Sequence, residues 1–512
     1  MTAERWPGTP REMLAARVAS SPDRVFLRSG AAAITFAEFE QAKRRMAGAL
    51  AESGVRQGDR VLIGMSNRPE MVIVQHAVAQ LGAVQVPLVP GLSSEELIWE
   101  ANHSGATTLV ADDSVAAALR PRLGECPQVR ECLFEVEAAL GHEPLEPEAL
   151  PDDPMAPWAI LYTSGSTGRP KGVVLPAAAF HSGGTGYSER FGVRAADNAL
   201  QPTPLGHAVG AVNIQCTALH TGCSITIVDR FSPRNFWGQV IESGATFLVL
   251  FPAQLNLLLE VQDGAPGPGE HPLRMVFTHA WHERFRRRFG TELKMCWGMT
   301  ETGAISAGSE PGYEGDGPEG YIGPPWPLAE MAAFDDQGKR LPSGQVGEIR
   351  LRHPHVMLGY LDDPESTAAS FADGWVRSGD RGYIDDRGHL VYLGRFKHVI
   401  KRSGENIGAE EVEAILDPLP GVAESLVFGV PDPIRTEEVM AVVVAAPGAV
   451  LEPVAVTDAV AERIARWKVP RYVLVVEEPL PRLPNGKLDR VSARERYDPT
   501  DAWDRSAASA SA

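Results

Sequence analysis

Apolar runs and stretches of helical periodicity alternate between residues 60 and 112. The predicted elements, in chain order, are a strand at Val61–Gly64, a helix at Pro69–Leu81, a strand at Val84–Pro87, a helix opened by Ser93 and Glu96, and a strand at Thr107–Ala111. Ser93 and Glu96 have the spacing of a capping box, which indicates where the second helix begins. Short buried strands separated by helices of this length predict parallel βαβ units.

A second group of the same kind follows, with strands predicted at Ser224–Asp229 and Thr246–Phe251 around a helix at Pro233–Ser243. It indicates a second sheet in the same large domain. Between Tyr321 and Leu393 the pattern changes to short strands broken by turns, with a hairpin turn at Asp385–Gly388. This region predicts a small antiparallel sheet or barrel appended to the α/β body.

A separate C-terminal unit is predicted after Gly394. Its first helix, Ala409–Leu416, begins with acidic residues and is followed by Pro418, which fits helix electrostatics and a proline stop. The other predicted elements are strands at Ser425–Val430, Val439–Ala445 and Tyr472–Val476 and a helix near Val456–Trp467. The fold class is therefore α/β. A large N-terminal domain of two βαβ-type sheets plus a small β-barrel (1–393) precedes a small α+β domain, and the tail from 497 to 512 is expected to be disordered.

The composition narrows the function classes. The 48 basic and 66 acidic side chains give the 512-residue chain a formal charge of −18. An acidic balance argues against a nucleic acid or an anionic membrane as the main partner, because either prefers a basic face. No window approaches ~18 uninterrupted apolar residues, and residues 1–10 lack the layout of a signal peptide. We therefore expect no integral membrane segment and a cytoplasmic location.

The cysteines are few and form no Cys-x-x-Cys pair; they are Cys126, Cys132, Cys216, Cys223 and Cys296. Neither a disulfide framework nor a zinc site is indicated. We expect these thiols to be buried.

The segment Tyr162–Gly172, Tyr-Thr-Ser-Gly-Ser-Thr-Gly-Arg-Pro-Lys-Gly, follows the apolar run Trp158–Leu161. Small glycines leave backbone N–H groups exposed, the hydroxyls add donors and Lys171 adds a cation, which together suit a polyphosphate. A flexible surface turn is the alternative, and the GxxxxGK[ST] pattern is not matched. The predicted phosphate-binding residues are Thr163, Ser164, Gly165, Ser166, Thr167, Gly168 and Lys171.

This string resembles the phosphate-loop signature of the adenylate-forming superfamily of acyl-CoA synthetases, amino-acid adenylation domains and luciferases. Further elements resemble motifs of the same family in the same order: the YGxTE-like Trp297–Gly303, the ribose element Trp375–Arg381, the hinge element Gly394–Ile407 and the lysine loop Pro484–Lys487. The resemblance spans nearly the whole chain. It implies an ATP-dependent acyl-CoA ligase that uses ATP, Mg²⁺ and coenzyme A, with a hinge at 394–397 and a mobile domain at 398–496.

The resemblance also implies roles for single residues. Joining a carboxylate to the α-phosphorus of ATP brings two anions together, so the site must supply positive charge and donors. By the family pattern, the reacting groups are contacted by Lys487, the α-phosphate by Thr300, the Mg²⁺ by Glu301, the adenine side by Trp297, and the ribose by Asp380 and Arg395. Outside the motifs, Asp380 could cap a turn, Glu301 could be a solvated helix-start acid, and Lys487 could be one more exposed lysine.

For thioester formation, the family pattern makes Lys397 the hinge residue about which the C-terminal domain swings. Gly404 matches the lining of the pantetheine tunnel, where a side chain would obstruct a thiol arm; it could also be a turn glycine with positive φ. Lys401 and Arg402 are assigned to the same tunnel. With Arg463, Arg466, Lys468 and Arg471 they either receive CoA phosphates or form solvated helix and strand edges.

His207 matches the family position that closes the acyl pocket and changes orientation between the half-reactions. No acid occurs between Pro204 and Gln215, where amino-acid-activating relatives place an aspartate, and an unpaired buried ammonium would be costly. The predicted pocket residues are His207, Ala208, Gly210, Ala211 and Gly298. The missing acid makes an α-amino acid an unfavourable substrate, and the small residues are consistent with room for a bulky aryl, alicyclic or polycyclic acid. Secondary metabolism is the expected setting.

The family pattern is broken on the adenine side. Where relatives carry a glycine-rich GGAP-type segment, this chain reads Phe277-Thr-His-Ala-Trp-His-Glu-Arg-Phe285, about four residues short. The altered loop comprises Thr278, His279, Ala280 and Trp281. Trp297 also replaces the usual tyrosine, which removes a hydroxyl and enlarges the stacking face.

Three hypotheses follow. The preferred one is a complete ligase whose loop is compensated by His279 and Trp281. The second is a non-adenylating ligase that receives a preformed acyl-adenylate from a separate adenylating enzyme and only forms the thioester. The third is a non-catalytic nucleotide- or acyl-binding relative.

The segment Asp229–Trp237 resembles the corresponding segment of ligases for carnitine and crotonobetaine, and binding of a quaternary ammonium would require an aromatic cage. The acid, a carrier protein in place of coenzyme A, and the oligomeric state, with a homodimer among the options, stay open.

Overall fold

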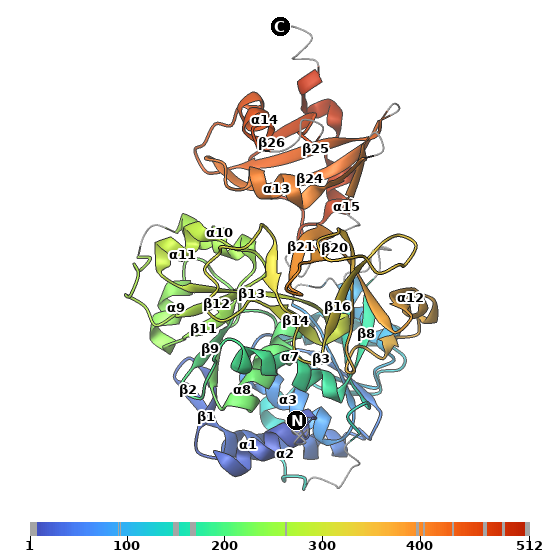
Figure 1. Cartoon of the computed structure of the whole chain (residues 1–512). Coiled ribbons are helices and arrows are strands. Elements are labelled where there is room, and N and C mark those ends of the chain that lie inside the picture. The colour runs from blue at the N-terminus through green and yellow to red at the C-terminus, as the bar shows by residue number, and fades with distance from the viewer. Residues whose placement is uncertain are drawn as a thin grey trace. The chain divides into compact units, whose positions relative to one another are not determined.

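The computed structural model describes residues 8–90, 92, 94–146, 153–163, 170–261, 264–395, 399–402, 405–432, 435–463, 468–483 and 487–506. The chain divides into two compact units. Unit 1 comprises Met1–Met331 and Leu351–Val376, and unit 2 comprises Ala332–Arg350 and Arg377–Ala512 (Figure 1). Unit 2 thus includes part of the small β-region that the sequence assigns to the N-terminal domain. The hinge at 394–397 stays a prediction.

One sheet of unit 1 has the strand order β18-β8-β7-β4-β3-β5-β6. The strands are β3 (Arg60–Gly64), β4 (Val84–Pro87), β5 (Thr108–Ala111), β6 (Glu131–Leu133), β7 (Pro157–Thr163), β8 (Lys171–Pro176) and β18 (Gly359–Tyr360). β3 pairs in parallel with β4 and β5, and the intervening chain forms α3 (Pro69–Gln80) and α4 (Ser94–Ser104). The predicted βαβ units are therefore confirmed, although Ser93 itself lies outside the described residues.

The second sheet of unit 1 has the order β14-β13-β12-β11-β9-β10-β1-β2. Its strands are β1 (Val25–Ser29), β2 (Ala32–Thr35), β9 (Asn198–Gln201), β10 (Ser224–Ile227), β11 (Phe247–Val249), β12 (Met275–Thr278), β13 (Glu292–Met299) and β14 (Ala304–Gly308). The six strands from β13 to β1 in this order pair in parallel with their neighbours. The two edge strands, β14 and β2, pair antiparallel with β13 and β1. This sheet confirms the predicted second α/β layer.

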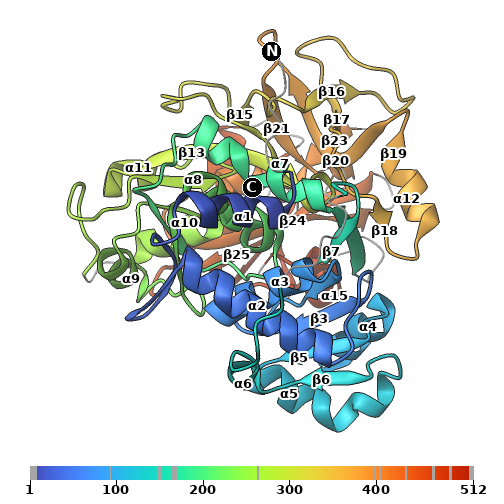
Figure 2. The same ribbon diagram turned by 90° about the horizontal axis from the view of Figure 1, so that it is seen from below.

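Unit 1 contains further helices besides α3 and α4. They are α1 (Pro10–Ser20), α2 (Phe36–Glu52), α5 (Asp113–Leu119), α6 (Val136–Ala139), α7 (Ala177–Glu189), α8 (Gln215–Thr221), α9 (Phe236–Ser243), α10 (Pro252–Glu260), α11 (Glu283–Phe289) and α12 (Pro364–Ser370). Capping explains where α2 begins, because Thr35 and Glu38 form a reciprocal capping box. α1, α2 and α3 pack against one another (Figure 2).

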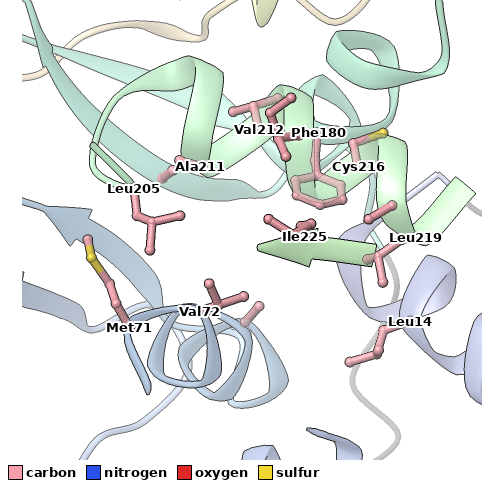
Figure 3. Close-up of a cluster of buried hydrophobic side chains, with 14 of the residues drawn as sticks. Leu14, Met71, Val72, Phe180, Leu205, Ala211, Val212, Cys216, Leu219 and Ile225 are labelled. Carbon is pink, nitrogen blue, oxygen red and sulfur yellow. The ribbon is translucent and has the colours of Figure 1, made fainter. Parts of the chain in front are cut away.

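A continuous apolar core joins α1, α3, α7, α8 and β10 (Figure 3). Its members include Leu14, Met71, Phe180, Cys216 and Ile225, each exposed by less than about a tenth. Leu205, Ala211 and Val212, from the segment predicted to form the acyl pocket, belong to the same core (Figure 3). Burial of this much apolar surface fixes the backbone that carries His207.

Most of the residues of four neighbouring strands, β16, β17, β20 and β21, belong to unit 2, and the unit boundaries fall within the first three. Their bounds are Glu330–Phe334, Gly347–Arg352, Trp375–Ile384 and Leu390–Arg395. The predicted hairpin turn joins β20 to β21, with the Asp385 N–H bonded to the His389 carbonyl at 2.9 Å and Gly388 in the left-handed region (φ 82°). This turn is confirmed.

The rest of unit 2 is a sheet of order β23-β22-β25-β26-β27, with β24 paired to β25. The elements are β22 (Val399–Arg402), β23 (Glu405–Gly408), α13 (Ala409–Leu416), β24 (Val422–Asp432), β25 (Thr436–Ala445), α14 (Pro453–Ala461), β26 (Tyr472–Val476), α15 (Arg490–Arg496) and β27 (Trp503–Asp504). Together the two units confirm the α/β class with a small C-terminal domain.

The expectation of a disordered tail from 497 is wrong for residues 497–506. Trp503 pairs with Val473 in the antiparallel β26–β27 ladder, and Tyr497 is 5% exposed. Arg471 also holds Asp504 at 3.0 Å. These long-range contacts order the segment, whereas residues 507–512 lie outside the described part of the chain.

The cysteines are unpaired thiols, and all but Cys132, which is partly exposed, are buried. Burial raises the pKa of Cys216, Cys223 and Cys296. The prediction of buried thiols is therefore confirmed for four of them. Among the helices that the structure describes, none combines the length and apolar character needed to cross a bilayer.

Candidate active site

The predicted phosphate loop connects the antiparallel strands β7 and β8. Tyr162 lies opposite Gly172 and Thr163 lies opposite Lys171, so the strand pair holds both ends of the loop together. The residues between them that were predicted to bind phosphate, Ser164, Gly165, Ser166, Thr167 and Gly168, lie outside the described residues. Their role stays a prediction.

The Tyr162 phenol anchors the incoming strand to α4. Its oxygen is 2.9 Å from Nδ1 of His103, whose ring stacks on Trp99 with centroids 4.6 Å apart. Burial raises the pKa of Tyr162 well above its usual value. The neutral phenol therefore acts as a structural hydrogen-bonding group at the entrance to the loop.

The YGxTE-like motif forms a tight turn between β13 and β14. Thr300–Thr302 is one turn of 3₁₀ helix, and Gly303 ends it with φ 72°. Thr302 is buried and donates to the Met299 carbonyl at 3.0 Å, which fixes the turn from inside. Thr300 and Glu301 stay partly exposed on its outer side. A β-bulge at Trp297/Gly298 precedes the turn, and Trp297 is buried.

A segment that the sequence analysis did not single out, residues 357–366, connects this turn with β8. The Met357 N–H donates to the Glu301 carbonyl at 2.8 Å. The Tyr360 hydroxyl donates to Oε1 of Glu301 at 2.8 Å, and the Tyr360 ring lies 4.9 Å from Nζ of Lys171. Nζ of Lys171 also donates to Oγ of Ser366 at 2.6 Å. Lys171 and Glu301, which the motifs predicted separately, therefore lie beside the same tyrosine.

The donor set around Glu301 fits a magnesium ion. Mg²⁺ prefers oxygen ligands and is usually held in nucleotide sites by one or two carboxylates together with phosphates and water. Within the described chain, the Glu301 carboxylate accepts a hydrogen bond from Tyr360 on one oxygen only and is partly exposed. This carboxylate, whose donors are oxygen atoms only, would hold the metal.

His207 lies at the start of a π-helix, Val209–Ile214, that leads into α8. Its Nδ1 accepts the Val209 N–H at 3.2 Å. The Phe251 ring lies edge-on to His207 at 6.2 Å and 6.1 Å from His279 of the adenine-side loop. The structure thus brings both the predicted acyl-pocket histidine and His279 of the predicted adenine-side loop close to Phe251, a residue that the motifs did not indicate.

A buried polar network supports the backbone around His207. Gln75 of α3 donates to the Leu205 carbonyl at 3.1 Å and accepts from Gln215 at 2.8 Å. Gln215 also donates to the Gly210 carbonyl at 3.1 Å, and its Oε1 lies 3.1 Å from Nε2 of His76. Because a buried, unmade hydrogen bond is costly, this network fixes the π-helix relative to α3.

His76 gives a prediction for pH dependence. Burial, together with the Lys43 charge, lowers its pKa to about 3, whereas unfolded histidine titrates near 6.5. The folded state binds the proton less readily, so the contribution of neutral His76 is complete above pH 6.5 and is lost as the pH falls toward 3. In denaturant unfolding between pH 6.5 and 4.5, we expect the wild-type stability to fall more steeply than that of His76→Gln, by up to ~1.4 kcal/mol per pH unit. Equal slopes would contradict this assignment; His142→Gln, at a partly exposed histidine, is the control.

The small residues near His207 are explained by packing. A Cβ on Gly206 would lie 2.3 Å from the Leu88 carbonyl oxygen, and one on Gly210 would lie 2.6 Å from the Pro204 carbonyl oxygen. Ala208 and Ala211 are buried in the core. Their size is therefore no measure of the substrate's size, and the assignment of these residues and Gly298 to the pocket stays a prediction.

Residues 279–282 connect β12 to α11 and contain most of the predicted adenine-side loop, whose departure from the family pattern stays a prediction. Thr278 is buried at the end of β12, and His279 is exposed. Trp281 donates from Nε1 to Glu283 at 3.1 Å and lies edge-on to Tyr313 at 5.3 Å. A Cβ on Gly315 would lie 2.2 Å from the Trp281 ring. The Trp281 side chain is thus held by Glu283, Tyr313 and the close approach of Gly315, while His279 lies near Phe251.

Unit 2 carries the predicted ribose residues and the predicted catalytic lysine. Asp380, which is 3% exposed, lies opposite Arg395 in the β20–β21 register, and its N–H donates to Oγ of Ser378 at 2.9 Å. Lys487 is exposed at the end of a loop whose stem is closed by the Leu483 N–H to the Lys487 carbonyl at 2.8 Å. The two ribose residues therefore share one strand pair.

The assignment of Arg402 to the CoA tunnel stays a prediction, and the structure places its side chain in an ion pair. Its guanidinium makes a two-pronged ion pair with Glu438, at 2.6 and 3.0 Å, and both side chains are buried. Arg471 is likewise held by Asp432 and Asp504. Both guanidinium groups therefore take part in ion pairs within unit 2. Lys397 and Gly404 lie outside the described residues, as does the side chain of Lys401.

Comparison with known proteins agrees with this geometry. Residues 14–361 match the family described as AMP-binding enzyme, and residues 411–487 match its C-terminal domain. A crotonobetaine/carnitine--CoA ligase of Salmonella arizonae is 31% identical over 484 residues, which cover 89% of this chain and 92% of the relative. The chain therefore belongs to the AMP-binding enzyme family.

Solved structures lead to the same class. ATP-bound MatB from Rhodopseudomonas palustris superposes with a TM-score of 0.86 at 27% identity, over 95% of this chain and 98% of that one. The o-succinylbenzoate coenzyme A synthetase MenE from Bacillus subtilis, in complex with AMP, gives 0.82 at 28% identity over 94% and 97%. The protein is an ATP-dependent, adenylate-forming ligase of the acyl-CoA synthetase type.

Proposed function

We propose that this ligase activates an aryl, alicyclic or other bulky carboxylic acid as its acyl-adenylate and transfers the acyl group to coenzyme A. The observation that carries the substrate class is the row of rings formed by His207, Phe251 and His279. Ring edges and faces suit an aromatic or alicyclic acid. No acidic residue occurs in residues 204–215 to pair with an α-ammonium group, and the name of the MenE relative is compatible with an aromatic acid.

In the first half-reaction, a carboxylate oxygen attacks the α-phosphorus of ATP and pyrophosphate leaves. Lys171 and the loop amides bind the phosphates, the Thr300 hydroxyl donates to the α-phosphate, and Asp380 and Arg395 bind the ribose. Lys487 donates to the incoming carboxylate and the bridging oxygen as their negative charges approach. Glu301 would hold Mg²⁺, which supplies positive charge to the phosphates.

In the second half-reaction, the thiolate sulfur of coenzyme A attacks the acyl carbon, a C–S bond forms, and AMP leaves with the C–O bond electrons. Lys487 serves only the first step, so the second requires that its loop be withdrawn. Lys397, Gly404 and Lys401 retain the hinge and tunnel roles that the family resemblance implies. His207 closes the acyl pocket between the two steps.

A non-adenylating ligase is the second candidate function. It is favoured by the short connection between β12 and α11 and by the way that Tyr313, Glu283 and Gly315 fix Trp281. A loop held in this way is less able to adapt to the adenine. In this case a separate adenylating enzyme supplies the acyl-adenylate, and this chain performs only thioester formation.

One experiment separates the two candidates. The purified enzyme receives coenzyme A with either a panel of carboxylic acids plus Mg-ATP or the matching synthetic acyl-adenylates, and acyl-CoA and AMP are followed by mass spectrometry. Acyl-CoA from an aryl or alicyclic acid plus ATP supports the proposal. Product from acyl-adenylates alone favours the second candidate, and product from neither contradicts both.

Lengthening the adenine-side loop gives a further prediction. Grafting a GGAP-type loop between Phe277 and Phe285 should lower the KM for ATP by about tenfold, or ~1.4 kcal/mol of binding, if the short loop limits nucleotide binding. Thioester formation from a supplied acyl-adenylate should change less than twofold. ATP–pyrophosphate exchange and thioester formation measure the two steps. An unchanged KM for ATP would show that the loop length is not limiting.

A further inference from the structure

We propose that Tyr360 is a positioning residue of the nucleotide site, which orients the Glu301 carboxylate toward the metal and supports Lys171 through its ring. The inference rests on the proposed function because it takes Glu301 as the ligand of Mg²⁺. It adds a residue outside the phosphate loop and outside the motif that contains Glu301. The tyrosine lies on β18, between these two motifs in space and after both in sequence.

The first step is the contact with Glu301. The phenol donates to Oε1 of the carboxylate at 2.8 Å, within the range of a charge-assisted hydrogen bond. A carboxylate on a short turn can otherwise rotate about its side-chain torsions. With Oε1 held by the phenol, the carboxylate keeps one orientation in which Oε2 can meet a metal.

The second step is the contact with Lys171. Its ammonium lies 4.9 Å from the centroid of the Tyr360 ring, within the distance of a cation–π interaction. Nζ also donates to Ser366 at 2.6 Å, at the start of α12. The Lys171 ammonium group lies at the C-terminal end of the predicted phosphate loop. The same segment that contacts the Glu301 turn, residues 357–366, therefore also supports this ammonium group.

The third step is the rigidity of the tyrosine itself. Tyr360 pairs with Val173 of β8, and its N–H donates to Oγ1 of Thr367 at 2.9 Å. The flanking N–H groups of Leu358 and Leu361 donate to carbonyls of β8, each at 2.8 Å. Backbone hydrogen bonds on both sides therefore fix the ring relative to the strand that leaves the phosphate loop. A side chain held in this way can position its two neighbours with little loss of entropy when they bind ligand.

The test is the coupling between Mg²⁺ and ATP binding. The dissociation constant of ATP is measured by calorimetry on the full chain, with saturating Mg²⁺ and with EDTA, without any acid substrate. In Tyr360→Phe, which keeps the ring, we expect Mg²⁺ to tighten ATP binding about five- to tenfold less than in the wild-type protein, with the value in EDTA unchanged. Tyr360→Leu should also weaken ATP binding in EDTA about threefold, because the ring beside Lys171 is lost.

Tyr383→Phe in unit 2, a half-buried tyrosine outside this site, is the matched control and should leave both constants unchanged. The inference would be overturned if Mg²⁺ tightened ATP binding equally in the wild-type protein and in Tyr360→Phe. It would also be overturned if Tyr360→Phe lost the same ATP affinity with Mg²⁺ and with EDTA, because that result indicates a merely structural role. A wild-type protein whose ATP binding ignores Mg²⁺ would also overturn it. Intact Mg²⁺ coupling without acyl-adenylate from any acid would contradict the proposed function alone.

Discussion

Replacing Lys487 by alanine is expected to lower the rate of acyl-adenylate formation by about 10²- to 10³-fold, the usual loss when one donor to a developing anionic charge is removed. The lysine is exposed on unit 2, at the end of a loop closed by the Leu483–Lys487 hydrogen bond, so its removal leaves no buried cavity. Thioester formation from supplied acyl-adenylate should stay within about twofold of wild type. ATP–pyrophosphate exchange and acyl-CoA formation measure the two rates.

The matched control for this variant is Lys339→Ala, which removes an exposed lysine of a turn in the same unit. It carries the same change of charge and should affect neither half-reaction. If Lys487→Ala slows both half-reactions equally, the lysine does not act in adenylation alone. If it slows neither, its assignment as the catalytic lysine is wrong.

Arg490→Met is expected to destabilise the C-terminal part of unit 2 by about 3–5 kcal/mol, because one partner of a buried ion network is lost while the other stays charged. The Arg490 guanidinium binds both oxygens of Glu413, one of them at 2.7 Å, lies 3.3 Å from Glu410, and donates to the Val427 carbonyl at 3.0 Å. The network joins α15 to α13 and β24. Hydrogen exchange of peptides from these elements, followed by mass spectrometry, measures the loss.

Arg494→Met, on the same helix but half exposed, is the matched control. Its ion-pair distance to Glu437 is 3.9 Å, so less than about 0.5 kcal/mol is expected. The double variant Arg490→Met, Glu413→Leu removes both charges and should recover much of the stability. Exchange rates in Arg490→Met that match those of Arg494→Met would mean that the buried network contributes little.

Local patterns were sufficient for much of the fold. The limits of α13 and β26 coincide with the predicted Ala409–Leu416 and Tyr472–Val476, because helical periodicity, a proline stop and an apolar run are properties of adjacent residues. The ordered segment around Trp503 was missed for the opposite reason. A strand of two residues has no pattern of its own and exists through its pairing with β26.

The candidate site shows the same division. Motifs indicated Lys171 and Glu301, but nothing in the sequence near either residue indicates Tyr360, whose contacts depend on β18 joining β8. The sequence analysis assigned Arg402 to ligand binding because a basic residue within a family motif can be recognised from the sequence alone. Its buried partner, Glu438, comes from another strand and becomes visible only in three dimensions.

The distribution of cysteines has a practical consequence for observing the predicted domain alternation. All five thiols lie in unit 1, and only Cys132 is partly exposed, whereas the sequence of unit 2 contains none. A Cys132→Ser background would leave thiols shielded by burial, so one cysteine introduced at an exposed position in each unit could accept a spin label or a dye with little background. Changes in the label-to-label distance on addition of ATP, acid or coenzyme A would then report the movement directly.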